Sequence, residues 1–62
     1  MEKLYIVRDH QTGVEFEYFD TLEKAQKCME KFVADDKISK IFEPRFYEIY
    51  NKETDTIEEV SE

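Results

Sequence analysis

The sequence has little of what most catalytic and metal sites require. Its 62 residues include one glycine, one proline, one cysteine and one histidine. A single glycine excludes a glycine-rich loop around a phosphate group, and a single cysteine excludes an internal disulfide. Metal sites need several nitrogen, sulfur or oxygen ligands at suitable spacings, and a nucleophile needs a positioned base. We therefore expect no enzymatic activity, no catalytic residue, no metal and no cofactor.

Long apolar runs and basic residues are also scarce. No stretch approaches the length of a transmembrane helix, and no basic and then apolar signal segment opens the chain. Nine basic residues against 16 acidic ones give a net charge of −7. This balance opposes direct binding to nucleic acid or to an anionic membrane, while it suits either docking on a basic protein surface or solubility alone. We expect a soluble, cytoplasmic protein in which Cys28 is a buried, reduced thiol.

Residues 20–34 contain the only clear helical period. Asp20 is the expected N-cap, with Glu23 three residues later in a capping box. No glycine or asparagine closes the segment, so we expect the helix to fray between Ala34 and Lys37. The predicted buried stripe consists of Leu22, Ala25, Cys28, Met29, Phe32 and Val33.

Four stretches rich in β-branched and aromatic residues predict strands at 3–8, 14–19, 45–51 and 56–60. The order ββαββ predicts a single α+β domain, residues 1–62, with a four-stranded, mainly antiparallel sheet and the helix on one face. The apolar residues between the helix and the third strand could form another helical turn or a lid over the core. We expect Ser61 and Glu62 to fray.

The two predicted hairpins resemble each other. Residues 5–13 and 47–55 share the pattern Tyr-x-(Val/Ile)-x-(Asp/Asn)-x-(Gln/Glu)-Thr-(Gly/Asp). Asp9 and Asn51 can each bond to the amides of the following turn, and Asp55 would take the left-handed position of Gly13. Duplication and convergent turn chemistry explain the pattern equally well, and both favour two similar hairpins around one helix.

A four-residue turn in the first hairpin pairs Val7 with Phe16 and Tyr5 with Tyr18, and it places His10 at an exposed tip. The helix-facing set would then be Tyr5, Val7, Val14, Phe16 and Tyr18.

The second hairpin is amphipathic in neither register. If Tyr47, Ile49 and Val60 face the helix, the opposite face carries a set of apolar side chains, namely Leu4, Ile6, Phe19, Phe46, Tyr50 and Ile57. An apolar face of that extent indicates a homodimer or a partner. In the opposite register, Phe46, Tyr50 and Ile57 would instead be buried.

Carboxylates cluster beside these aromatic residues. Glu48 would face Glu59 across the second hairpin, an unfavourable pairing unless a cation or a basic group of a partner separates them. A protein partner with a basic surface would satisfy both features. The candidate partner-binding residues are Glu15, Glu17, Phe46, Glu48, Tyr50, Ile57, Glu58 and Glu59.

In format, the chain resembles short phage and prophage proteins of the anti-CRISPR type. The segments that carry the resemblance are YIVRDHQTG, FDTLEKA and YEIYNKETD, at 5–13, 19–25 and 47–55. The resemblance implies an inhibitor that binds host nucleic-acid-handling machinery, in effect imitating phosphates with carboxylates. The alternative is a small homodimeric interaction protein without an inhibitory role.

Overall fold

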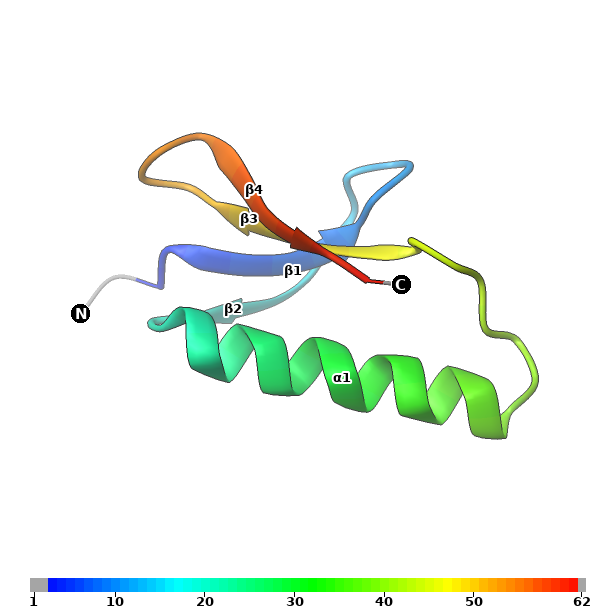
Figure 1. The fold of residues 1–62 in the computed structure, drawn as a ribbon. Coiled ribbons are helices and arrows are strands. Elements are labelled where there is room, and N and C mark those ends of the chain that lie inside the picture. The colour runs from blue at the N-terminus through cyan, green and yellow to red at the C-terminus, as the bar shows by residue number, and fades with distance from the viewer. Residues whose placement is uncertain (1–2, 62) are drawn as a thin grey trace.

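The computed structural model describes residues 3–61 and confirms the predicted ββαββ order. Its elements are β1 (Tyr5–Asp9), β2 (Glu15–Phe19), α1 (Leu22–Ile38), β3 (Tyr47–Asn51) and β4 (Thr56–Val60). The strands form one antiparallel sheet in the order β2-β1-β3-β4. The helix crosses one face of this sheet (Figure 1), so the α+β prediction is confirmed.

The core lies where the two central strands meet the helix. Val7 of β1 pairs with Ile49 of β3, and both are fully buried against Ala25 and Met29 of α1. The burial of Val7, Ile49 and Met29 contributes roughly 1.5–3 kcal/mol for each side chain. The half-buried side chains around this centre are Tyr5, Phe19, Leu22, Cys28, Phe32 and Tyr47. The helical period therefore predicted which face meets the core, although only Ala25 and Met29 of the stripe are buried. Cys28, expected to be buried, is half-buried.

The predicted register of the first hairpin is wrong by one residue. Val7 lies opposite Glu17 and Tyr5 opposite Phe19, with a β-bulge next to Val7. A bulge inserts one extra residue into a strand and shifts every later side chain to the other face. Phe19 consequently packs against the helix, whereas Tyr18 lies on the opposite face.

A bulge at the equivalent place shifts the second hairpin. Glu59 pairs with Ile49, and Val60 pairs with Glu48. The expectation that Glu48 faces Glu59 is therefore wrong, as is the helix-facing orientation of Val60. Tyr47 and Ile49 do face the helix, as predicted.

The predicted repeat corresponds to two equivalent hairpins. The Asp9 carboxylate accepts bonds from the amides of the next turn at 2.8 and 3.2 Å, and the Asn51 amide oxygen does the same at 2.9 and 3.3 Å. Gly13 and Asp55 both have positive φ, at 80° and 56°. The two turns lie at opposite ends of the sheet (Figure 1). The hairpins are thus related by an approximate two-fold axis through the Val7–Ile49 pair.

The helix begins one residue later than predicted. Thr21 is the N-cap, and its hydroxyl accepts a bond from the Lys24 amide at 3.2 Å. Asp20 instead forms an ion pair with the Lys24 ammonium at 3.0 Å, and this hydrogen bond lowers the pKa of the Asp20 carboxyl.

The helix also ends later than predicted, at Ile38. The Tyr47 hydroxyl donates to the Asp36 carboxylate at 2.7 Å and ties the last turns to β3. Lys40 adopts a left-handed conformation, and the Ile41 amide donates to the Asp36 carbonyl at 2.9 Å. This pattern closes a helix C-terminus. Ile38 and Ile41 are 80% and 66% exposed, so they form no lid over the core.

Candidate functional site

The sheet face opposite the helix carries two cross-strand rows of side chains. The pairing places Tyr18, Ile6, Tyr50 and Ile57 in one row. The other row contains Glu15, Arg8, Glu48 and Val60. One row is apolar and aromatic and the other is largely charged, so the apolar side chains expected on this face are confined to one row.

Glu48 is buried in the charged row and has two basic neighbours. Its side chain is only 3% exposed, with one carboxylate oxygen 2.6 Å from Nε of Arg8 and the other 2.7 Å from Nδ1 of His10. The expectation of a solvated His10 at a loop tip is therefore wrong. The antiparallel pairing of β1 with β3 brings the three side chains together.

Side chains of the sheet itself cover part of this face, while Tyr18 and Ile57 remain exposed at its two edges. The Arg8 guanidinium lies 4.1 Å from the centre of the Tyr50 ring. Tyr50 also donates a hydrogen bond to Asp55, which raises the pKa of the Tyr50 hydroxyl. Ile6 is buried, contrary to the expectation that it is exposed.

The structure separates the eight predicted partner-binding residues into different places. Glu48 is buried, Tyr50 and Phe46 are half-buried, and the Phe46 ring packs edge-on against Tyr47. Glu15 and Glu17 lie on β2, at the opposite edge of the sheet from β4. The exposed members that lie together, all on β4, are Ile57, Glu58 and Glu59.

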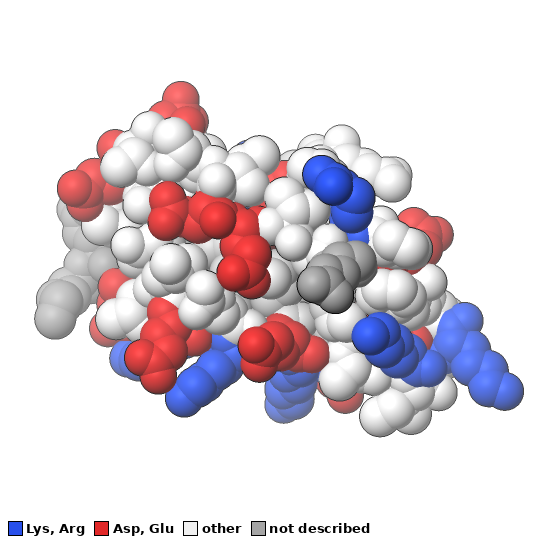
Figure 2. Space-filling view, viewed as in Figure 1, with Lys and Arg blue, Asp and Glu red and all other residues white. Residues whose placement is uncertain are grey.

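Exposed carboxylates gather on one flank of the molecule, which we call the acidic flank. It consists of Glu30 on α1, Glu53 and Asp55 in the β3–β4 turn, and Glu58 and Glu59 on β4. Figure 2 shows that acidic side chains dominate this side of the sheet, whereas lysines line the lower border along the helix. Among residues 3–61, no member of the acidic flank forms an ion pair.

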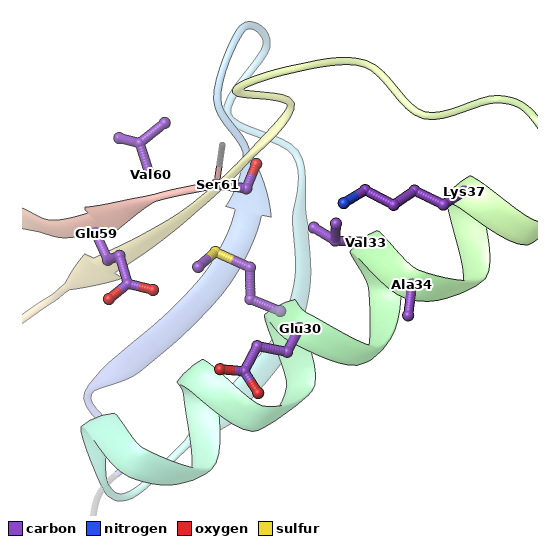
Figure 3. Close-up of a pocket in the computed structure, with 8 residues that line it drawn as sticks. Glu30, Val33, Ala34, Lys37, Glu59, Val60 and Ser61 are labelled. Carbon is purple, nitrogen blue, oxygen red and sulfur yellow. The ribbon is translucent and has the colours of Figure 1, made fainter.

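An open groove of about 610 Å³ separates α1 from β4. The helix packs over β1, β2 and β3 and does not approach β4 closely. Glu30 and Glu59 project into the groove from its two walls, and Lys37 extends from the helix toward Ser61 (Figure 3). The described residues that line it are Met29, Glu30, Val33, Ala34, Lys37, Glu59, Val60 and Ser61.

Ser61 is ordered at the end of this groove, contrary to the expectation that it frays. It is buried, its amide donates to the Tyr47 carbonyl at 2.8 Å, and its hydroxyl accepts from the Tyr47 amide at 3.0 Å. The other residue expected to fray, Glu62, lies outside the described residues. Aligning the two repeats would have indicated the groove, because Ser61 occupies the position of Phe19 in the first hairpin.

Cys28 and His10 lie on opposite sides of the sheet and therefore do not pair as nucleophile and base. Cys28 is half-buried, and desolvation raises the pKa of its thiol, which disfavours the nucleophilic thiolate. The imidazole of His10 is bonded to Glu48, on the sheet face opposite the helix. Within residues 3–61 no group of three or more His, Cys, Asp or Glu side chains could hold a metal ion. Over the same residues, no helix has the length and apolar character needed to span a membrane.

Comparison with known proteins adds no family to these observations. No family model matches the chain, and no significant match was found among curated proteins or solved structures.

Proposed function

We propose that this chain is a non-enzymatic protein-binding module whose acidic flank docks on a basic site of a nucleic-acid-handling host protein. It would act as an inhibitor, like the phage proteins that its format resembles. The observation that carries the proposal is the run from Glu53 to Glu59, in which four exposed acids have no basic residue among them.

These carboxylates are suited to a basic partner for two reasons. They project from a hairpin whose two strands are already paired, so binding need not order the backbone and costs only the rotamer freedom of the side chains. They also form no ion pair among the described residues, so a partner need not displace an internal one. A basic site that recognises successive phosphates is complementary to such a row of negative charges.

Inhibition assays on purified DNA- or RNA-cleaving host enzymes test this function. The wild-type chain should inhibit a susceptible enzyme in competition with its nucleic acid, and E53K/E58K should relieve the inhibition. The control E15K/E17K changes the net charge equally on the opposite edge strand and should inhibit as wild type does. Inhibition that E53K/E58K leaves unchanged would rule out the electrostatic mode.

The alternative, a homodimer formed through the face opposite the helix, receives less support from the structure. Ile6 is buried and Arg8 lies over Tyr50, so the apolar area left on that face is smaller than the sequence suggested. Sedimentation at high protein concentration distinguishes the two candidates, because a dimer would dissociate on dilution.

A further inference from the structure

We infer that the groove between α1 and β4 binds an extended segment of a partner protein in which one large apolar side chain is flanked by lysine or arginine. This inference rests on the proposed function and names the part of the partner that is recognised. The groove volume, about 610 Å³, lies within the range of sites that hold a few side chains.

The first hairpin carries a large apolar side chain at the position where the groove has Ser61. Flanking the other side of the helix is an equivalent hollow of about 550 Å³, lined by Phe19 and Glu17, which occupy the positions of Ser61 and Glu59. Phe19 packs against the core there. In the second hairpin the small Ser61 leaves the apolar side chains of α1 beside an open space. A large apolar side chain from a partner would supply what Phe19 supplies on the other side.

The charged side chains in the walls of the groove favour a basic occupant. Glu30 and Glu59 project into it from opposite sides, and Lys37 is the only basic residue among the lining residues that the structure describes (Figure 3). Glu59 accepts one exposed bond, from the Gln26 amide at 3.2 Å. The charge left in the groove is negative, which favours lysine or arginine on either side of the apolar anchor.

The outer edge of β4 favours an occupant in an extended conformation. β4 ends the sheet, so its outer edge pairs with no other strand of residues 3–61. A peptide that adds to such an edge places every second side chain on the helix side, where the groove lies. A second copy of the chain is disfavoured, because its own edge strands would bring Glu15 and Glu17, or Glu58 and Glu59, against the same carboxylates.

A peptide titration followed by NMR tests the inference. The probe is the synthetic peptide Thr-Lys-Thr-Phe-Thr-Lys-Thr, in which phenylalanine and both lysines share one face of a strand. It should shift the amide resonances of Val33, Ala34 and Glu59. Peptides with serine for phenylalanine, or with glutamate for both lysines, should bind at least about tenfold more weakly, a difference of ~1.4 kcal/mol.

Two variants occupy the place of the apolar anchor from different walls of the groove. Ser61→Phe copies Phe19 but removes the bond to the Tyr47 amide, so Ala34→Trp, at an exposed helix position, serves as a second block. Either folded variant should lose at least about nine-tenths of the probe affinity. Binding that persists in Ala34→Trp, or a probe that shifts none of the groove resonances, would overturn the inference.

The failures of the two proposals can be told apart. Glu53 and Glu58 do not line the groove, so E53K/E58K tests the proposed function while Ala34→Trp tests the groove. If Ala34→Trp still inhibits a susceptible enzyme but E53K/E58K does not, the groove inference is wrong and the proposed function stands. If no enzyme is inhibited but the probe binds in the groove, the proposed function is wrong and the groove remains a peptide site.

Discussion

Glu48 is the buried carboxylate of the charged row on the sheet face opposite the helix. A carboxylate with a side chain 3% exposed is stable there because Arg8 and His10 each bond to one of its oxygens. The sequence did not predict this cluster, since its members come from strands that are distant along the chain. The alternation of apolar and polar residues along β3 predicted neither the burial of Glu48 nor its two basic partners.

Removing Arg8 should therefore destabilise the fold by more than an ordinary surface substitution. Arg8→Ala deletes an ion pair to a buried carboxylate and the stacking over Tyr50, and we expect a loss of about 2–3 kcal/mol. Urea denaturation at pH 7 measures this loss. The exposed Lys31→Ala should change stability by less than ~0.5 kcal/mol. An Arg8→Ala variant as stable as the Lys31→Ala control would mean that the cluster does not hold the face together.

Asp9 makes the fold sensitive to acid in a way that Asn51 does not. Hydrogen bonds from the turn amides, first that of Gln11, hold the pKa of the Asp9 carboxyl below its usual value. A lowered folded-state pKa gives stability that is present above the unfolded pKa, about 3.9, and is lost as pH falls through the folded value. Asp9→Asn copies the neutral Asn51 cap and should lose less stability between about pH 5 and pH 2 than wild type.

Denaturation at the two pH values checks this prediction, and Asn51→Asp provides the converse variant. The Asn51→Asp chain should be more acid-sensitive than wild type, because it adds a second carboxylate in the same turn geometry. Equal acid sensitivity of wild type and Asp9→Asn would contradict the assigned role of the carboxylate.

The helix shows which features of an element follow from its own sequence and which depend on contacts with the rest of the chain. Its period predicted which face meets the core, because spacing along a helix fixes the face of each side chain. Its end could not be predicted, since Tyr47 of β3 holds Asp36 and a lysine rather than a glycine closes the C-terminus. The strands show the same division: their existence was predicted from composition, but the bulges that reset both registers leave no clear pattern in the sequence.

Lys40 should be replaceable by glycine with a gain in stability. Its φ of 60° is left-handed, a conformation that costs a residue with a side chain roughly 1 kcal/mol. Lys40→Gly should therefore raise the free energy of unfolding by about 0.5–1 kcal/mol, and thermal denaturation measures it. In the reverse control, Gly13→Ala should be destabilising, because Gly13 has φ of 80° even though a methyl group would meet no neighbour there. A loss of stability in Lys40→Gly would refute this account of the helix end.

The bond between Tyr47 and Asp36 should make the last helical turns sensitive to alkali. Burial and the hydrogen bond to Asp36 raise the pKa of Tyr47 to about 12. A raised folded-state pKa gives stability that is complete below the unfolded pKa, about 10, and is lost as pH rises toward the folded value. Tyr47→Phe should be less stable at pH 7 by about 0.5–1.5 kcal/mol but should lose less between pH 10 and 12. Parallel pH-dependent losses in both proteins would contradict the assignment.

At the scale of the whole molecule, the two hairpins share a plan but differ in what they place beside the helix. The repeat predicted their equivalence, because turn residues specify local geometry. The groove was not predicted: the alignment of Ser61 with Phe19 indicates a small residue beside α1, but the repeat does not show that the helix leaves β4 uncovered. The helix covers β2, where Phe19 packs, and leaves β4 free beside Ser61.

The affinity of a susceptible nucleic-acid-handling enzyme for the chain tests the central claim most directly. If carboxylates of the acidic flank meet basic groups, E53K/E58K should raise the dissociation constant by at least about 100-fold, or ~2.7 kcal/mol. The control E15K/E17K should change it by less than about threefold, and added salt should weaken wild-type binding. Equal effects of the two double variants would mean that net charge alone governs association, and that result would contradict a docking site on the acidic flank.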